Sequence, residues 1–211
     1  MADPRSKASV RDAFDAIADE FDTTRQRPWP AVVRLLEALP AGTRVLDLGC
    51  GNGRHLRAAT SFGLRGIGLD SSSGLLVHSR TAGPVVCGDL THLPFRSQTA
   101  DACLVIACLH HLTAADRHTA LHEAWRVLRH GGMALAMVWA LDQPRFAHLQ
   151  SEKGHGADTS VPWGREPDIV ERFYHLYADG ELAAEFARAG FVVQSYFREE
   201  DNYAVLGRRH G

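Results

Sequence analysis

Short apolar stretches alternate along the chain with segments whose apolar residues recur at helical spacing. Five of these stretches are rich in Val, Leu, Ile and Ala and are three to seven residues long. Strands that alternate with helices in this way are typical of a doubly wound sheet, in which successive strands run parallel. The parallel strands expected from this pattern are 45–48, 66–69, 85–87, 102–106 and 133–139.

The C-terminal end departs from this alternation. A helix expected over 181–189 is followed by two strand-like segments, 191–197 and 203–206, which are close enough in sequence to form a hairpin. The sequence therefore predicts an α/β fold with a doubly wound, mostly parallel seven-stranded sheet and an antiparallel C-terminal hairpin.

Amphipathic helices are expected before the first strand, within residues 9–39. The first covers about 10–21, and the second begins near Pro30, since proline is favoured in the first turn of a helix. Their apolar faces consist of Val10, Phe14, Ile17 and Phe21 in the first helix and Val33, Leu36 and Leu39 in the second.

A further helix is expected after the fourth strand. Thr113 followed by Asp116 resembles a capping box, and Gly131 is expected to end the helix. Its apolar stripe consists of Leu121, Trp125 and Leu128. Residues 141–167, in contrast, contain several Gly, Pro, Asp and Ser residues without a clear period, which predicts an irregular segment on the substrate side of the domain.

Size and composition favour one globular domain over residues 1–211, because 45% of the 211 residues are hydrophobic and 23% are charged. No apolar run approaches the roughly 20 residues that cross a bilayer, so we expect a cytoplasmic protein without membrane association.

The four cysteines lack C-x-x-C spacing, which favours buried thiols over a zinc site. The net charge of −2 gives no global attraction for nucleic acid but leaves room for a local basic patch.

The first strand runs into a glycine-rich loop, RVLDLGCGNG, at residues 44–53. Glycine lets the backbone turn tightly and lets a ligand approach the main chain, so the loop is expected to hold a cofactor; the alternatives are a structural turn or another nucleotide site. Arg54 replaces the third glycine of a dinucleotide fingerprint, which disfavours nicotinamide and flavin. A carboxylate before the loop suits the sulfonium cation of S-adenosylmethionine. The expected cofactor residues here are Asp47, Gly49, Gly51, Asn52 and Gly53.

Two further acidic residues follow predicted strands, and a doubly wound fold places its ligands at such strand ends. Asp70 ends the second strand, where a carboxylate can accept hydrogen bonds from both ribose hydroxyls. Asp89 follows the third strand and can accept the adenine amino hydrogen, while Leu90 covers the ring. Alternatively, either acid is a turn or helix-cap residue.

The glycine loop and these acids resemble class I methyltransferases. Five further segments, taken in order, resemble the tRNA wobble-uridine 5-carboxymethyl methyltransferase family over nearly the whole chain. They are EFDTTRQRPWP, IACLHHL, VPW, RFYHLYADGEL and EEDNYAVLGRR. Two features depart from the family pattern: the segment between VPW and YHLY is reduced to 164–172, and Tyr203–Ala204 stands where an aromatic pair is expected.

The resemblance implies methylation of the carboxylate of 5-carboxymethyluridine in tRNA to the methyl ester, with S-adenosylmethionine as cofactor. It also implies a small zinc-binding activator subunit as partner, and the apolar segments CLVIACL and MALAMVWA permit such a contact, although burial within the sheet explains them equally well.

Carboxylate methylation needs no strong general base, since carboxylic acids have pKa values around 4 and are ionised at neutral pH. Positioning groups are needed instead, and a guanidinium can hold a carboxylate through two hydrogen bonds. Arg25, which matches the family pattern more directly than Arg27, is the expected clamp. Trp29 can stack on the uracil ring or, equally, anchor the start of the following helix.

His110 and His111 follow the fourth strand, and one of them is expected to orient the target group while the other packs or caps. The sequence does not choose between them. Tyr174 and His175 are expected to line the substrate pocket, with ordinary core positions as the alternative. Scattered arginines are more often solvated surface than phosphate contacts. They are Arg165, Arg172, Arg188, Arg198, Arg208 and Arg209.

Two other functions share the glycine loop, Asp70 and Asp89. A small-molecule methyltransferase, for example one acting on a quinone precursor, would not require an arginine clamp or a tRNA surface. A non-catalytic S-adenosylmethionine-binding subunit is disfavoured by the intact acidic positions.

Overall fold

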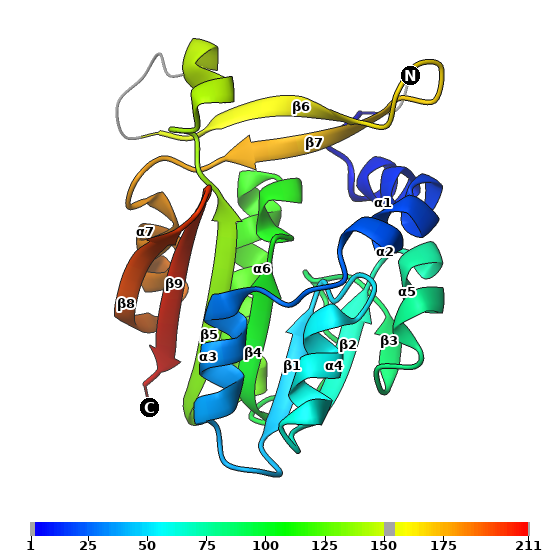
Figure 1. Cartoon of the computed structure of the whole chain (residues 1–211). Helices are drawn as coiled ribbons and strands as arrows, with labels where there is room; N and C mark the ends of the chain where they lie inside the picture. The colour runs from blue at the N-terminus through cyan, green and yellow to red at the C-terminus, as the bar shows by residue number, and fades with distance from the viewer. Residues whose placement is uncertain (1–2, 150–154, 211) are drawn as a thin grey trace.

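The structure is a computed structural model that describes residues 3–149 and 155–210. A seven-stranded sheet in the order β3-β2-β1-β4-β5-β9-β8 forms its centre (Figure 1). The strands of this sheet are β1 (Arg44–Leu48), β2 (Arg65–Asp70), β3 (Val85–Cys87), β4 (Ala100–Ile106), β5 (Leu128–Trp139), β8 (Phe191–Glu199) and β9 (Asn202–Arg209).

Strands β1 to β5 pair in parallel, whereas β9 pairs antiparallel with both β5 and β8. This confirms the predicted mostly parallel sheet with its antiparallel C-terminal hairpin. Because β1 lies between β2 and β4, the glycine loop that follows β1 sits where the strand order reverses.

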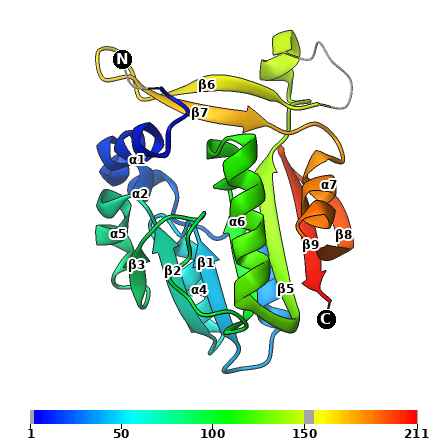
Figure 2. The ribbon, with the colours of Figure 1, turned by 180° about the vertical axis from the view of Figure 1, so that it is seen from behind.

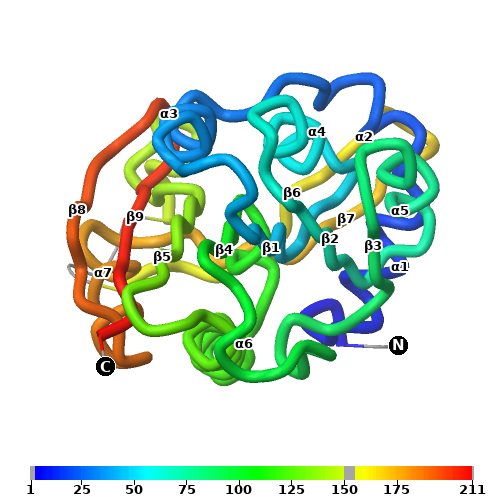
Figure 3. The backbone as a smooth tube through the Cα atoms, turned by 90° about the horizontal axis from the view of Figure 1, so that it is seen from below, coloured from blue at the N-terminus to red at the C-terminus, as the bar shows by residue number. Residues whose placement is uncertain are grey.

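Helices cover both faces of the sheet, with α3 and α4 on one side and α6 and α7 on the other (Figure 3). The α-helices are α1 (Lys7–Ala16), α2 (Ala18–Thr24), α3 (Pro30–Ala38), α4 (Arg54–Ser61), α5 (Ser73–Ser79), α6 (Ala114–Val127) and α7 (Glu181–Arg188). Two short 3-10 helices are η1 (Leu109–His111) and η2 (Pro144–Leu149). No helix among the described residues is long and apolar enough to cross a membrane.

A separate two-stranded sheet arches over the carboxyl ends of the parallel strands (Figures 1 and 2). It consists of β6 (Ala157–Trp163) paired antiparallel with β7 (Val170–Leu176). The expectation of an irregular segment over 141–167 is therefore wrong for β6 and η2, while residues 150–154 lie outside the described residues. The partner of β6 is β7, which lies outside the segment 141–167, so the composition of that segment alone did not reveal the pairing.

Two predicted helices have different bounds in the structure. The single helix expected over 10–21 is two helices that meet at Ile17, because α1 and α2 each pack against α5. The helix expected to end at Gly131 ends instead at Val127, because Leu128 already pairs with Ala100 as the start of β5. Pairing along the sheet thus outweighs the local glycine signal.

Candidate active site

A cavity of about 420 Å³ opens at the carboxyl ends of the parallel strands, beneath β6, β7 and α1. The glycine loop, Asp70 and Asp89 line it at the ends of β1, β2 and β3, with Lys7 beside Asp89, and further aromatic and cationic side chains line it from the ends of β4 and β5 and from β6 and β7. Most of the predicted site residues line this cavity: Arg25, Trp29, Gly49, Gly51, Asn52, Asp70, Asp89, Leu90, His110, His111 and Tyr174. Asp47, Gly53, Arg27 and His175 do not.

The glycine loop needs glycine for conformation and for space. Gly49 and Gly53 have φ values of +78° and +77°, in the left-handed region that disfavours other residues. A Cβ on Gly49 would lie 2.6 Å from the Cβ of Cys108, and one on Gly53 would lie 2.9 Å from the Cβ of Ser79. Gly53 therefore supports the loop from outside the cavity, and Gly49 brings bare backbone to its wall.

Asp70 ties the glycine loop to the end of β2. Its Oδ2 accepts a hydrogen bond of 2.8 Å from the Gly51 amide, and its Oδ1 accepts one of 2.9 Å from the Ser72 amide. Burial raises the pKa of Asp70 despite these donors. Each carboxylate oxygen can accept more than one hydrogen bond, so hydroxyl donors of a ligand would fit this group.

Asp89 is held at the end of β3 by the N-terminal helix. Lys7 Nζ lies 2.6 Å from Asp89 Oδ2, and the Thr91 amide donates to Oδ1 at 2.9 Å. Burial raises the pKa of this carboxyl, but the hydrogen bonds from Lys7 and Thr91 outweigh it and leave the pKa below its usual value. Asp89 is therefore ionised at neutral pH, beside Leu90 in the cavity wall.

Asp47 lies beneath the loop rather than in the cavity wall. It is only 1% exposed, and both carboxylate oxygens are buried without a hydrogen-bond partner. Burial raises its pKa to about 7, against the opposing effect of Arg54. Its position thus differs from the ligand contact expected from the sequence, and its charge can act on the cavity only through space.

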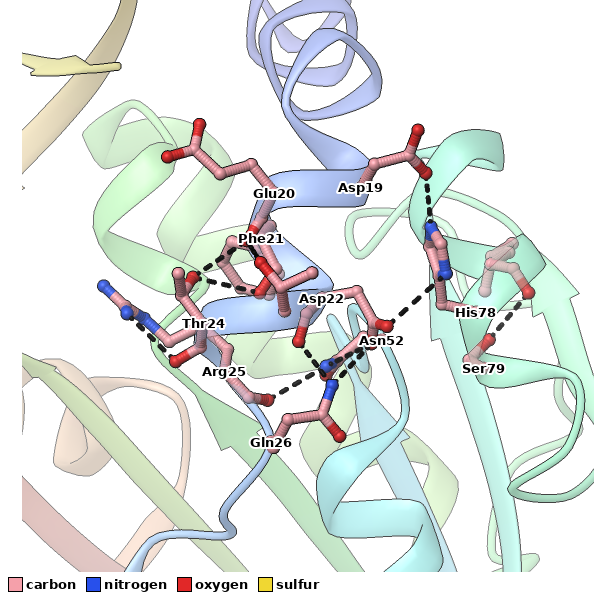
Figure 4. Close-up of polar contacts among 12 residues, drawn as sticks. Asp19, Glu20, Phe21, Asp22, Thr24, Arg25, Gln26, Asn52, His78 and Ser79 are labelled. Carbon is pink, nitrogen blue, oxygen red and sulfur yellow. Dashed lines mark hydrogen bonds and ion pairs between the residues drawn. The ribbon is translucent and has the colours of Figure 1, made fainter. Parts of the chain in front are cut away.

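Asn52 fastens the N-terminal helices to the glycine loop. Its Nδ2 donates to Asp22 Oδ1 and to the Arg25 carbonyl, both at 2.9 Å, as Figure 4 shows. His78 makes a second tie, with its Nε2 2.9 Å from Asp19 Oδ1. These hydrogen bonds hold the α2 helix over one end of the cavity. The guanidinium of Arg25 points away from Asn52.

His110 and His111 are both buried in the cavity wall, 1% and 7% exposed. The Trp139 amide donates to Nδ1 of His110 at 3.1 Å, whereas Nδ1 of His111 lies 2.9 Å from the Phe173 carbonyl. Burial lowers the pKa of His110 well below its usual value and that of His111 to about 3. Both rings are neutral at physiological pH.

The backbone partners fix opposite tautomers for the two neutral rings. An amide can only donate, so Nδ1 of His110 is unprotonated and its proton is on Nε2; a carbonyl can only accept, so Nδ1 of His111 carries the proton. His110 therefore offers a hydrogen-bond donor through Nε2, and His111 offers an acceptor.

The aromatic wall is larger than the sequence predicted. The ring of Tyr174 stacks on Trp139 with centroids 4.5 Å apart and on His110 at 4.8 Å. Trp139, Trp163 and Arg172 line the cavity but were not among the predicted site residues. Trp163 and Arg172 lie in the VPW and RFYHLY segments, whose family resemblance could have identified them. Trp139 is the last residue of an apolar strand, and nothing in the sequence set it apart from a core position.

Arg25 and Trp29 lie where the N-terminal segment meets the cavity. The guanidinium carbon of Arg25 is 5.2 Å from the centroid of the Trp163 ring, and Arg54 lies 5.8 Å from the Trp29 ring. Trp29 also precedes α3, and its Nε1 is buried without an acceptor. Trp29 is thus placed both to stack on a ligand in the cavity and to anchor the start of α3.

Arg27 and His175 lie outside the cavity. Arg27 is exposed and lines a neighbouring hollow of about 640 Å³, together with Arg25, Arg54 and Arg145. His175 is bound on both sides by acids, with Nδ1 2.7 Å from Asp158 and Nε2 2.8 Å from Glu181. It therefore joins β6 and β7 to α7, which differs from the substrate contact expected from the sequence.

Comparison with known proteins assigns the family. A methyltransferase domain model matches residues 46–136. The tRNA (carboxymethyluridine(34)-5-O)-methyltransferase of Schizosaccharomyces pombe is 33% identical, and the alignment covers 95% of this chain and 96% of that protein. The chain belongs to this family.

This chain covers other members of the family to different extents. The Saccharomyces cerevisiae protein of the same name is 27% identical, with 99% of this chain and 98% of that protein covered. The Xenopus tropicalis protein, alkbh8, is 32% identical over 93% of this chain, and the chain spans only 40% of its length.

Solved structures confirm the class I methyltransferase fold. One is the methyltransferase in a complex with the Haloferax volcanii Trm112 methyltransferase activator, with a TM-score of 0.71, 22% identity and coverage of 96% and 98% of the two chains. Another is Burkholderia thailandensis 1,6-didemethyltoxoflavin-N1-methyltransferase with bound S-adenosylhomocysteine, with a TM-score of 0.74, 20% identity and coverage of 100% and 92%.

Proposed function

We propose that the protein methylates the carboxylate of 5-carboxymethyluridine at the wobble position of tRNA, using S-adenosylmethionine, to give the methyl ester. The observation that carries this proposal is the two-sided cavity. Asp70, Asp89 and bare loop backbone line the ends of β1 to β3, and the Arg172 guanidinium lies among the aromatic rings of β5, β6 and β7. Family membership supports the same substrate.

The acidic side fits the cofactor. Asp70 would accept the ribose hydroxyls and Asp89 the adenine amino hydrogen beside Leu90, and Gly49 and Gly51 would offer bare backbone to the ligand, since all five residues line the cavity. Asp47, in its ionised form, favours a cation in the cavity through space. When bound, S-adenosylmethionine supplies an electrophilic methyl group on a sulfonium sulfur.

The other side positions an anionic nucleophile. The substrate carboxylate is ionised at neutral pH, so no residue has to remove a proton from it. His110 donates from Nε2 to an oxygen of the substrate, and His111 stays neutral and supports the Phe173 carbonyl. Trp29 stacks against the uracil ring. Orientation of the carboxylate supplies several kcal/mol of the rate enhancement, by analogy with intramolecular reactions.

The neighbouring hollow gives the tRNA a place to continue. Arg27 and Arg145 line it, and it shares Arg25, Trp29 and Arg54 with the active-site cavity. Guanidinium groups beside an opening of this kind can contact phosphates on either side of the modified nucleotide. Arg27 is accordingly assigned to the RNA backbone instead of the carboxylate.

A partner subunit belongs to the proposal as well. The complex of a structurally similar methyltransferase with the Trm112 activator supports an activator for this chain, and zinc binding by that subunit stays a prediction. Coexpression with an activator subunit should raise soluble yield and activity. A soluble chain with full activity alone would show that no such subunit is needed. The cytoplasmic location also stays a prediction.

Purified tRNA containing carboxymethyluridine tests the proposed function, with nucleoside mass spectrometry as the readout. The enzyme should convert carboxymethyluridine to its methyl ester and leave tRNA that lacks the carboxymethyl group unchanged. Absence of the ester, in the presence of an activator subunit and with cofactor binding verified, would overturn the proposal and favour a small-molecule substrate.

A further inference from the structure

Arg172 is a buried cation in the cavity wall. It lies on β7, is 5% exposed and lines the cavity. Its guanidinium carbon is 4.8 Å from the centroid of the Trp163 ring and 5.2 Å from that of Tyr174. Nη1 donates to the Tyr174 hydroxyl at 2.9 Å, while Nε is buried with no hydrogen-bond acceptor.

Other buried arginines of this chain have partners that Arg172 lacks. Arg117 is 4% exposed and places Nε 2.9 Å from Glu185 Oε1. Arg209 is 6% exposed and also leaves Nε without an acceptor, but its Nη1 donates to three backbone carbonyls. Within residues 3–149 and 155–210, Arg172 forms no ion pair, and its one hydrogen-bond acceptor is a neutral phenol.

Among the described residues, no ion pair compensates the buried charge of Arg172. Burial lowers the pKa of its guanidinium most; Arg25 and Arg145 lower it further, whereas Tyr174 and Glu171 raise it. Arg25 lies 5.2 Å from the same Trp163 ring. A buried charge without a counter-ion destabilises a fold, so a site of this kind is expected where a ligand brings the opposite charge.

We propose that Arg172 binds the carboxylate of the substrate and selects it over neutral analogues. This inference rests on the proposed function and names the residue that recognises the reacting group. Nε is the unpaired donor already present in the free protein, and a guanidinium can present two parallel N–H groups to a carboxylate. Arg25 adds positive charge from the N-terminal segment but is not the principal clamp.

The reaction removes the attraction that Arg172 provides. A carboxylate oxygen forms a bond to the methyl carbon while the carbon–sulfur bond breaks, and its electron pair stays on sulfur. The products are an ester and a thioether, both neutral, and no proton is transferred. Arg172 therefore holds the anionic substrate and has no ion pair with the product, which favours product release.

Binding measurements without turnover test this role. The protein, with its activator subunit and saturated with S-adenosylhomocysteine, is titrated with anticodon stem-loops that carry carboxymethyluridine or the neutral carbamoylmethyluridine. The natural protein should prefer the carboxylate by roughly 10- to 100-fold, the range of a buried charge-assisted hydrogen bond. Arg172→Gln should bind both stem-loops alike, and Arg172→Lys should keep part of the preference.

Arg188→Gln is the matched control, since Arg188 is an exposed arginine on α7 that does not line the cavity. Chemical denaturation of the free protein supplies a second measurement. Arg172→Gln should be as stable as the natural protein or more stable, because the substitution removes an uncompensated buried charge. A large loss of stability would assign Arg172 to the fold instead.

The outcomes separate this inference from the proposed function. If the natural protein prefers the carboxylate stem-loop and Arg172→Gln keeps that preference, Arg172 is not the clamp while the proposed substrate stands. The same result together with loss of preference in Arg25→Gln would move the role to Arg25. If the natural protein shows no preference at all, the carboxylate substrate itself is wrong.

Discussion

His110 and His111 are adjacent in sequence but make opposite hydrogen bonds through Nδ1. The His110 ring accepts from the Trp139 amide, and the His111 ring donates to the Phe173 carbonyl. The strand β5 supplies the first partner and β7 the second, so packing of the β6–β7 sheet over the cavity selects a donor and an acceptor from two identical residue types.

The rate of methyl transfer should be independent of pH between about 6 and 8. The substrate carboxylate is ionised above its pKa of about 4, and the lowered pKa values of both histidines keep them neutral throughout this range. Single-turnover rates at saturating cofactor, whose positive charge favours the ionised form of Asp47, measure the relevant step. A falling acidic limb with an apparent pKa of about 6 to 7 that persists in the Asp47→Asn variant would indicate a histidine base and contradict this account.

Asp70→Ala should weaken S-adenosylmethionine binding by roughly 10- to 100-fold, since the loss of charge-assisted hydrogen bonds costs about 1.5–3 kcal/mol. Isothermal titration calorimetry measures the change, with circular dichroism to verify folding. Asp168→Ala, at an exposed aspartate away from the cavity, is the control. Unchanged affinity in a folded Asp70→Ala variant would remove Asp70 from the cofactor site.

Asn52→Ala should release the α2 helix from the glycine loop. The substitution removes two partly buried hydrogen bonds, which together stabilise the fold by about 1–3 kcal/mol. Hydrogen exchange of the amides in α2 should accelerate. Gln26→Ala, which removes two exposed hydrogen bonds to Asp22, should have a much smaller effect because water can replace them. Equal exchange in both variants would show that Asn52 does not hold α2.

Asp47→Asn should stabilise the cofactor-free protein more strongly as the pH rises. The folded-state pKa of about 7 lies above the usual aspartate value of 3.8, so the folded protein binds more protons between these values and loses stability as the pH rises toward 7. The Asn variant lacks this loss. The stability difference should therefore grow by up to about 1.4 kcal/mol per pH unit between pH 4 and 7.

Urea denaturation over this pH range measures the difference between the natural protein and the Asp47→Asn variant. A stability difference that stays constant with pH would show that Asp47 is solvated or paired in the folded protein.

The sequence predicted the elements whose signals are local. Buried parallel strands have apolar runs in their sequence. The three glycines, Asp70 and Asp89 follow or end such strands, and the fold brings these strand ends together. The sequence of β6 gave no such signal, because this strand is stabilised by its pairing with β7 and by packing over the cavity.

The substrate side was harder to predict because burial there is set by tertiary contacts. Arg172 looked like one of several surface arginines, yet the β6–β7 sheet buries it against Trp163. His175 looked like a pocket residue, but it has two acidic partners away from the cavity. Asp47 precedes the loop in sequence, but its side chain is buried beneath the loop and does not line the cavity.

The most direct test of the central claim uses S-adenosylmethionine with an isotopically labelled methyl group and tRNA that contains carboxymethyluridine. The account predicts label in the wobble nucleoside that mild alkali releases as methanol, because saponification cleaves a methyl ester. Label that resists mild alkali would place the methyl group on nitrogen, carbon or a ribose hydroxyl, and would contradict carboxylate methylation.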